Sequence, residues 1–515
     1  MNKKNYIAVL DFGSQYTQLI ARRIREHNVY SEILSYKTSA KNLIKKDVVG
    51  IILSGGPSSV YDKKSINIDP KIFDLNIPIL GICYGMHLII KYFGGEVKSK
   101  NRGEYGFSNV KKEVNNVLFK EIDDNTKVWM SHGDEIVSLS SSIRIIAKSS
   151  NGIIAGIQHK EKKYFGLQFH PEVQHTVQGK IFLSNFLFNI SECLPIWTAS
   201  NFISESIKLI RNSVKENESV ITGVSGGVDS SIVATLLHKA IGNRSKCIFI
   251  DHGLLRKNEA QDVMSFLKKG LKINIKKYDY SKIFIQRLKG ITDPEVKRKI
   301  IGEQFIRSFE EVSDKYNKTK YLAQGTLYPD VIESGGTNEG PAVTIKSHHN
   351  VGGLPERMNF KLLEPIRMLF KDEVREVGRK LGLPEYIIGR HPFPGPGLAV
   401  RILGEVNNKR IKMLSEADQI YIDILKETGE YDKIWQAFAV LIPTKTVGVM
   451  GDNRTYENLI GLRAVTSSDG MTAESYRLPY DILNLCANKI VNEVKGINRV
   501  VYDVTSKPPS TIEWE

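Results

Sequence analysis

The sequence predicts an α/β protein with two parallel-sheet domains and a small α+β domain after them. Short apolar strands alternate with helix-patterned segments over residues 1–197, and a second series of the same kind begins after Glu218. A segment rich in proline and glycine, at Arg390–Gly397, then precedes a region where strands and helices follow no regular alternation. Strand–helix alternation is typical of a parallel sheet, which carries its site at the carboxyl ends of its strands.

Length and charge limit the possible classes of protein. A chain of 515 residues is too long for one hydrophobic core, and we predict domains over residues 1–197, 198–390 and 391–515. The content of 41% hydrophobic and 25% charged residues is typical of a soluble globular protein. The net charge of +15 would suit a nucleic-acid-binding protein. Because the basic residues are spread along the chain, we instead expect small anionic substrates and no nucleic acid.

The cysteines and the N-terminal residues indicate the cellular compartment. The four cysteines lie far apart without metal-ligand spacing, which is typical of a reduced, cytosolic protein. The apolar run before Asp11 is too short for a signal peptide. No stretch approaches the roughly 18 apolar residues of a membrane helix. We therefore expect a cytoplasmic protein that does not contact a membrane.

Three buried strands are predicted in the N-terminal third, at Tyr6–Asp11, Val48–Ser54 and Ile77–Ile82. Helical spacing follows the first strand at Tyr16–Glu26 and the third at Met86–Phe93. The third strand runs into the sequence Gly-Ile-Cys-Tyr-Gly. This pattern predicts a nucleophile elbow with a cysteine at its tip.

Cys83 lies at the tip of that elbow, before a helix N-terminus that favours the thiolate. In isolation the pattern would more often hold a buried structural cysteine. The segment Tyr164–Glu172 changes this balance, because it predicts a strand that ends in His-Pro-Glu. His170 would then act as the base, and Glu172 would fix its tautomer.

These motifs, with Ser54–Ser58 and Ser131–Asp134, resemble those of the class I glutamine amidotransferases. The resemblance covers residues 1–197. It implies that the cysteine attacks the side-chain amide of glutamine, forms a glutamyl thioester and releases ammonia. It also implies that backbone N–H groups of Gly55, Gly56 and Tyr84 stabilise the oxyanion.

The chain departs from that family at His87. The family usually carries glutamine at this position, where it lines the pocket for the substrate glutamine. His87 therefore leaves the contacts to the substrate open, although the chemistry of the nucleophile is unaffected.

A second motif organises the middle of the chain. Val220–Ala234 predicts a strand, a glycine-rich loop and a helix, an arrangement that suits a phosphate group. The loop lacks the spacing and the lysine of a Walker A motif. It resembles the loop of the N-type ATP pyrophosphatases, which split ATP between its α and β phosphates. The ATP-binding residues implied are Ser225, Gly226, Gly227, Val228, Asp229, Ser230 and Ser231.

Further strands are predicted at Lys246–Asp251, Lys272–Asp279 and Tyr321–Thr326. The mixed charges of Asp293–Lys299 predict an exposed helix start. The segment Lys346–Gly353 contains two adjacent histidines without a third ligand nearby, so cationic contacts to phosphate or a simple solvated loop are both favoured over a zinc site.

The C-terminal third begins at Arg390–Gly397, whose prolines and glycines cannot continue a helix or a central strand. We place a domain boundary here. The pattern beyond it predicts helices at residues 411–427 and 479–494 and extended segments at 437–449, 458–464 and 500–504. The tail Lys507–Glu515 mixes a lysine, hydroxyls and carboxylates, which suits a polar ligand.

Taken together in order, these motifs resemble the glutamine-hydrolysing GMP synthases over nearly the whole chain. The resemblance implies a ligase of purine (GMP) biosynthesis that adenylates the 2-oxygen of XMP with ATP. Ammonia then displaces AMP to give GMP. It further implies Mg²⁺ near Asp229, a lid over ATP at Asp293–Lys299, and a homodimer formed by the C-terminal domain. The XMP contacts implied are Gln436, Lys507, Ile512 and Glu513.

Three other classes of protein would account for part of these features. A glutamine-dependent NAD synthetase shares the loop, but its nitrilase-type glutaminase does not match the elbow. A tRNA-thiolating enzyme would need paired cysteines near the loop, where only Cys247 lies. A nucleic-acid-binding protein would explain the charge and would be retained on RNA or DNA in a salt-sensitive way, but it gives no role to Cys83.

Overall fold

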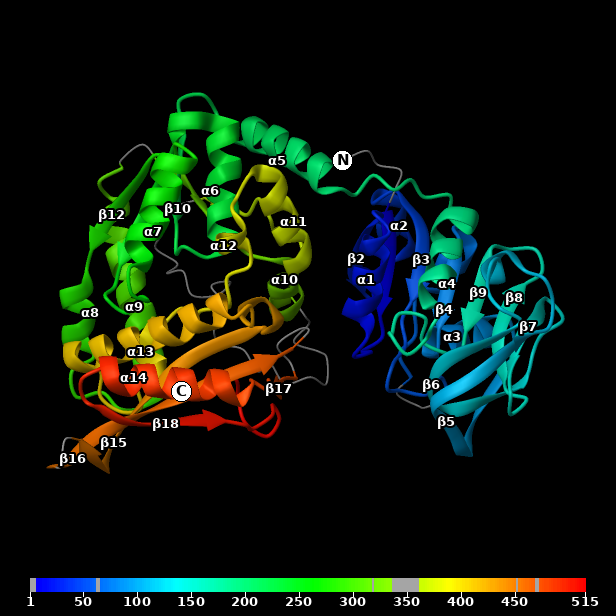
Figure 1. Cartoon of the computed structure of the whole chain (residues 1–515). Helices are drawn as coiled ribbons and strands as arrows, with labels where there is room; N and C mark the ends of the chain where they lie inside the picture. Colours follow the sequence, from blue (N-terminus) through cyan, green and yellow to red (C-terminus); the bar gives the residue numbers. More distant parts are fainter. Residues whose placement is uncertain (1–5, 62–64, 317–318, 336–360, 451–452, 468–471) are drawn as a thin grey trace. The chain divides into compact units, whose positions relative to one another are not determined.

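The computed structural model describes the chain apart from six segments, and its described residues form two compact units (Figure 1). The first unit extends to Phe202, and the second begins at Ile203. The Lys346–Gly353 segment lies outside the described residues. The segments left out are residues 1–5, 62–64, 317–318, 336–360, 451–452 and 468–471.

A nine-stranded sheet forms the core of the first unit. Its parallel part has the order β2-β1-β3-β4-β9, and this part confirms the predicted parallel sheet. These strands are short, and all except the edge strand β2 are almost entirely apolar, as expected of strands covered on both faces. They are β1 (Tyr6–Asp11), β2 (Tyr30–Ser35), β3 (Val48–Leu53), β4 (Ile79–Ile82) and β9 (Tyr164–Leu167).

The sheet continues beyond β9 with antiparallel strands that the sequence analysis did not predict. Burial alternates along much of β6, so one of its faces is polar and the strand lacks the apolar run of a buried strand. These strands are β8 (Ile154–His159), β7 (Ile143–Ser149), β5 (Glu96–Lys112) and β6 (Asn125–Ser138), in that order across the sheet.

Helices cover the parallel strands of this unit (Figure 1). Helix α3 packs against β3, β4 and β9 and carries the apolar residues that follow the elbow. The α-helices are α1 (Thr17–Glu26), α2 (Ala40–Lys45), α3 (Tyr84–Tyr92) and α4 (Gly179–Ser184), with single turns at Pro70–Asp74 and Val117–Phe119 and a π-helix at Asn185–Ile190.

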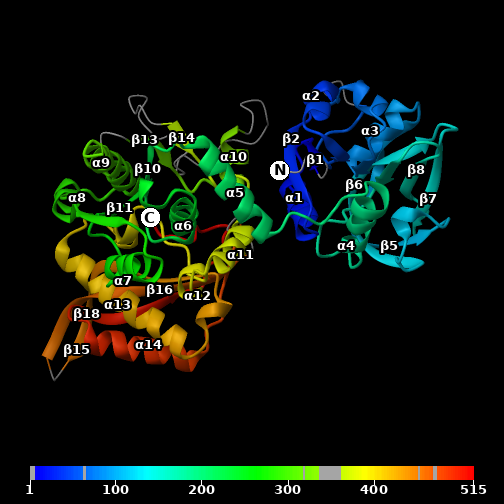
Figure 2. The ribbon, with the colours of Figure 1, turned by 90° about the horizontal axis from the view of Figure 1, so that it is seen from above.

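The second unit contains a five-stranded parallel sheet of order β12-β11-β10-β13-β14. Its central strand, β10, leads into the glycine-rich loop and helix α6, as the sequence predicts. Helix α11 packs beside α6 (Figure 2). The strands are β10 (Ser219–Gly223), β11 (Ser245–Asp251), β12 (Ile275–Asp279), β13 (Thr319–Ala323) and β14 (Lys361–Leu363).

Helix α5 (Ala199–Ser213) leads into this sheet. The α-helices of the described residues that pack around or follow it are α6 (Val228–Ile241), α7 (Glu259–Ser265), α8 (Ser281–Arg287), α9 (Pro294–Ser313), α10 (Tyr328–Gly335), α11 (Lys371–Leu381) and α12 (Glu385–Ile388).

The C-terminal region has the α+β arrangement that the sequence predicts. Helices α13 (Asn408–Glu427) and α14 (Tyr480–Glu493) contact each other and pack on its sheet (Figure 1). One hydrophobic core joins this region to the parallel sheet, since Ile221 and Leu254 belong to the same buried cluster as Leu414 and Ile460. The domain boundary at residue 390 stays a prediction. The strands are β15 (Gln436–Met450), β16 (Asn453–Thr466), β17 (Glu474–Ser475) and β18 (Ile497–Asp503).

The segment Asp293–Lys299 begins helix α9, as its charge pattern predicts. Asp293 caps the helix by accepting a hydrogen bond from the N–H of Val296 at 2.9 Å. Lys297 is fully buried, although its neighbours are charged. Its Nζ donates to the carbonyl oxygens of Ala399 and Ile402 and pairs with the Glu515 carboxylate.

Candidate active sites

Cys83 sits on a strained turn between β4 and α3. Its backbone has a φ of +52°, a left-handed conformation that is rare for a residue with a side chain. A β-carbon on Gly81 would lie 2.4 Å from the backbone of Gly85, and one on Gly85 would lie 2.3 Å from the carbonyl oxygen of Leu53. Only glycine fits at these two positions, so the sequence pattern forms a nucleophile elbow.

His170 and Glu172 lie at the same end of the sheet as Cys83. Strand β9 ends at Leu167, so the two residues follow the strand and do not continue it as predicted. The His170 ring is hydrogen-bonded through Nδ1 to Oε1 of Glu172 at 2.8 Å. All three side chains are buried. This arrangement leaves the Nε2 side of the ring for Cys83 and fits a base whose tautomer a carboxylate fixes.

Two opposing influences act on the pKa of His170. Burial alone would lower it, but the Glu172 carboxylate and Cys83 together raise it to about 10. A raised pKa favours the imidazolium at neutral pH. The site can therefore hold a thiolate–imidazolium pair, which is the reactive form of a cysteine nucleophile.

The glycine turn after β3 borders this site. A β-carbon on Gly55 would lie 3.3 Å from Cε1 of His170, and one on Gly56 would lie 2.8 Å from the carbonyl oxygen of Phe12. Tyr84 follows the nucleophile and starts α3. The backbone of these residues thus lies next to Cys83 and His170, where oxyanion donors are needed.

The second candidate site is the loop between β10 and α6. Gly226 adopts a φ of +84°, and Gly227 precedes the first turn of α6. The hydroxyls of Ser230 and Ser231 donate to the carbonyl oxygen of Gly227 at 3.1 and 2.9 Å. A loop of this kind directs free N–H groups of a helix N-terminus toward an anion.

Asp229 lies in the first turn of α6 and is paired with Lys371 at the start of α11. The Nζ atom of Lys371 donates to both carboxylate oxygens at 2.8 Å. A β-carbon on Gly325 would lie 3.2 Å from the side chain of Asp229. The segment after β13 therefore approaches the loop closely.

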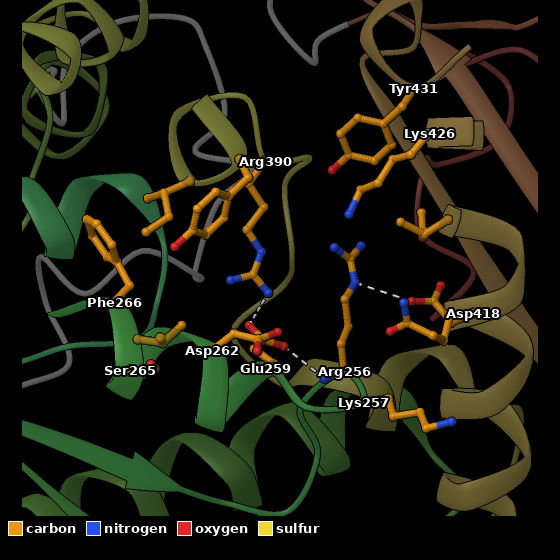
Figure 3. A pocket seen from close by; sticks show the side chains of 15 residues that line it. Arg256, Lys257, Glu259, Asp262, Ser265, Phe266, Arg390, Asp418, Lys426 and Tyr431 are labelled. Carbon is orange, nitrogen blue, oxygen red and sulfur yellow. Dashed lines mark hydrogen bonds and ion pairs between the residues drawn. The ribbon is translucent and has the colours of Figure 1, made fainter. Parts of the chain in front are cut away.

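A cavity of about 380 Å³ adjoins this loop. Arg390 lines it and also donates to the carbonyl oxygen of Gly226 at 3.2 Å. Figure 3 shows Arg256 and Arg390 at this cavity, where Arg390 pairs with Glu259 and Arg256 pairs with Asp418. Nη2 of Arg256 is buried and makes no hydrogen bond to any described residue. A buried guanidinium group with a free donor fits an anionic ligand.

The proline–glycine segment connects this cavity with the C-terminal tail. The Phe393 ring lies between two arginines, with the Cζ atoms of Arg256 and Arg401 at 4.8 and 5.0 Å from its centroid. Arg401 binds the Glu513 carboxylate through two hydrogen bonds of 3.0 and 2.8 Å. Gln436 donates to the same carboxylate at 2.6 Å.

The four residues predicted to contact XMP lie in different surroundings. Gln436 and Glu513 meet directly, whereas Ile512 is buried in a cluster with Phe438 and Val465. Lys507 is held through its backbone, which exchanges two hydrogen bonds with Ala473. The tail is thus ordered and packed on the C-terminal sheet.

Several residues of these sites were missed by sequence reasoning. Lys371 and Arg256 lie in ordinary-looking charged segments, and no local pattern distinguishes them. Arg390 could have been found, because it opens the rigid proline–glycine segment that was interpreted as a boundary.

Comparisons with known proteins match this arrangement. The model of the family "Glutamine amidotransferase class-I" matches residues 8–190, "NAD synthase" matches residues 202–302, and "GMP synthase C terminal domain" matches residues 423–514. An amidotransferase site followed on one chain by a pyrophosphatase-type loop defines a glutamine-dependent ligase.

Full-length relatives specify the family. A protein from Chlorobium chlorochromatii named GMP synthase [glutamine-hydrolyzing] is 56% identical over 515 residues and spans 99% of both chains. Proteins of the same name from Chlorobaculum tepidum and Synechocystis sp. are 54% and 52% identical, covering 99% and 100% of this chain and 99% and 96% of their own. The chain belongs to the family of glutamine-hydrolysing GMP synthases.

None of the helices within the described ranges combines the length and apolar composition needed to cross a bilayer.

Proposed function

We propose that this chain makes GMP from XMP, ATP and glutamine, with Cys83, His170 and Glu172 releasing the ammonia. The observation that carries this proposal is the buried elbow cysteine next to a histidine that a carboxylate orients at 2.8 Å. The Cys83 sulfur attacks the side-chain carbonyl of glutamine, and the proton held by His170 passes to the departing ammonia. Water then cleaves the thioester and releases glutamate.

The oxyanion of the tetrahedral intermediate needs donors that are in place before the reaction. We assign the backbone N–H groups of Gly55, Gly56 and Tyr84 to this role. The contact of a β-carbon on Gly55 with the His170 ring supports the assignment, since the turn has to approach the ring closely.

In the second unit, the loop Ser225–Ser231 binds the pyrophosphate part of ATP. The α-phosphate then passes to the 2-oxygen of XMP, pyrophosphate leaves, and ammonia replaces AMP. The free N–H groups at the start of α6 support this role of the loop, as does the absence of a Walker lysine that would hold a γ-phosphate.

Magnesium fits this loop as a counter-cation. Within the described part of the chain, no three His, Cys, Asp or Glu side chains gather closely enough to hold a metal alone. Mg²⁺ is commonly bound by one or two carboxylates together with substrate phosphates. Asp229 fits that donor set, and its pairing with the Lys371 ammonium supports a position that accepts positive charge. The ion would neutralise the charge of the departing pyrophosphate.

We propose that XMP occupies the region between the cavity of Figure 3 and the C-terminal tail. The free donor of Arg256 suits its phosphate, while Gln436 and Glu513 suit the polar edge of its base. Ile512 and Lys507 belong to the tail that closes this region. Arg256→Met is expected to raise the KM for XMP selectively, and Lys269→Met, at an exposed lysine that does not line the cavity, is the control.

The remaining assignments follow the family. We propose a cytoplasmic homodimer formed by the C-terminal domain, domains over residues 1–197, 198–390 and 391–515, and no nucleic-acid partner. Sedimentation would test the dimer, and salt-dependent retention on RNA or DNA would contradict the last assignment.

One assay tests the proposed function. Enzyme, XMP, ATP, Mg²⁺ and ammonia should yield GMP and AMP in equal amounts, and ADP as the product would argue against adenylation. Cys83→Ala should lose synthesis from glutamine and keep synthesis from ammonia. Loss of both activities in a folded variant would contradict the two-site scheme.

A further inference from the structure

Two buried hydrogen bonds lead from helix α3 to the nucleophile. His87 lies in the first turn of α3 and is 2% exposed, and Gln168 follows β9 and is 1% exposed. The Nε2 atom of His87 lies 2.7 Å from Oε1 of Gln168. The Nε2 atom of Gln168 in turn donates to Sγ of Cys83 at 3.7 Å. Neither His87 nor Gln168 has a part in the chemistry proposed above.

The direction of these bonds fixes the tautomer of His87. An amide oxygen only accepts hydrogen bonds, so Nε2 of His87 has to carry the proton. Burial lowers the pKa of His87 to about 4, against smaller opposing influences of Gln168 and Asp134. The ring is therefore neutral at the pH of the reaction and donates from Nε2.

The proton on His87 decides which end of the Gln168 amide faces the sulfur. With its oxygen bound to His87, the amide presents an N–H group to Sγ, and such a donor favours the thiolate. A flipped amide would turn its NH₂ group toward the N–H of His87, so the bond to His87 would be lost and no N–H group would face the sulfur. The carbonyl oxygen of Ser131, 3.7 Å from Sγ, accepts a hydrogen bond from the thiol and offers no donor to the thiolate.

We propose that His87 is a positioning residue for glutamine hydrolysis, which acts by holding the Gln168 amide with its N–H group on the Cys83 sulfur. This inference rests on the proposed function and deepens it. It also gives a role to the residue at which the chain departs from other class I amidotransferases. A glutamine at position 87 could donate an amide N–H to Gln168 in the same way, so the exchange preserves the donor.

The test compares three variants by two measurements. His87→Leu removes the donor, His87→Gln replaces it, and Gln168→Met removes the amide at similar volume. The first measurement is the pH profile of Cys83 alkylation by iodoacetamide, which needs no substrate. The second is kcat/KM for glutamine, with ammonia-driven synthesis and thermal unfolding as controls. Other titratable groups also influence the two residues under test. Glu172 and His170 influence Cys83, and the charges of Asp134 and His132 influence the pKa of His87. None of these four residues is substituted in any variant.

His87→Leu is expected to lower kcat/KM for glutamine about 3- to 10-fold, the effect of one neutral hydrogen bond. Its alkylation profile should move to higher pH, while ammonia-driven synthesis should not change. His87→Gln should restore the profile. The double variant His87→Leu/Gln168→Met should be no slower than Gln168→Met, because His87 acts through Gln168.

An unchanged alkylation profile in both His87→Leu and Gln168→Met would overturn the inference. So would additive losses in the double variant, or a His87→Gln variant as impaired as His87→Leu. Should the parent protein fail to make GMP while alkylation follows the expected pattern, the proposed function fails and the positioning role stands.

Discussion

The ammonium group of Lys371 lies 2.8 Å from both carboxylate oxygens of Asp229, at the mouth of the loop that we assign to pyrophosphate. Both side chains are partly open to solvent, at 48% and 30%. Ion pairs of this exposure contribute little to stability. Lys371 can therefore leave Asp229 at small cost when a phosphate group and its counter-cation arrive.

Lys371→Met is expected to lower kcat/KM for ATP about 10- to 100-fold, because a charged hydrogen bond to phosphate is lost. Lys380 lies exposed on the same helix, and Lys380→Met is the matched control. Glutamine hydrolysis measured as glutamate release should be equal in both variants. Equal kcat/KM values for ATP in the two variants would mean that Lys371 pairs with Asp229 but does not bind phosphate.

Asp229→Ala is expected to lose synthesis from both ammonia and glutamine, since the pyrophosphate would lack its carboxylate-bound counter-cation. The glutaminase unit should remain folded, as measured by alkylation of Cys83. Asp229→Asn keeps the size of the side chain, so its activity over a range of Mg²⁺ concentrations distinguishes loss of metal binding from a change in the fold. Full activity of Asp229→Ala would contradict the assignment of this loop.

Glu172→Gln is expected to change how stability depends on pH. Burial lowers the pKa of His170, but the Glu172 carboxylate and Cys83 outweigh it and raise the pKa to about 10, so the folded state holds this proton more tightly than the unfolded state does. That stabilisation is complete below roughly pH 6.5, the unperturbed value, and is lost as the pH rises through 10. The free energy of unfolding of the parent protein should fall over this pH range, and that of Glu172→Gln should fall less. The difference between the two falls should be about 1 kcal/mol or more. Urea denaturation at several pH values checks this, and parallel curves would exclude His170 as the titrating group.

Glu515→Ala is expected to destabilise the second unit strongly. The variant leaves Lys297 buried and charged with only carbonyl partners. Breaking such a pair typically costs about 3–5 kcal/mol. Lys297→Met/Glu515→Ala removes both charges and should recover part of the loss. The exposed Lys299→Met is the control, and a loss in Glu515→Ala no larger than in that control would show that the pair is not stabilising.

Sequence reasoning succeeded where chemistry is encoded locally. The elbow around Cys83 and the loop around Gly226 are short motifs whose glycines have steric reasons visible in the chain. Strands β1, β3 and β4 were predictable because they are covered on both faces and so nearly all apolar.

Contacts between distant segments could not be predicted in the same way. The segment Arg390–Gly397 was interpreted as a break, yet Phe393 lies against Arg256 and the carbonyl oxygen of Pro392 accepts from Gln436 at 3.3 Å. A rigid segment can separate domains or can fix side chains in a site, and composition is the same in both cases. The antiparallel strand β6 was missed because its alternating pattern is weaker than an apolar run.

The φ of +52° at Cys83 has a consequence for the evolution of this chain. A residue with a β-carbon at this φ of +52° and ψ of −105° lies in a sparsely populated region, which costs about 1–3 kcal/mol. Cys83→Gly is therefore expected to be more stable than Cys83→Ala, which differential scanning calorimetry can measure. Where ammonia is plentiful and glutamine hydrolysis is under weak selection, purely structural selection would favour loss of the nucleophile. Its persistence in a lineage would then indicate that glutamine is the nitrogen source on which that lineage depends.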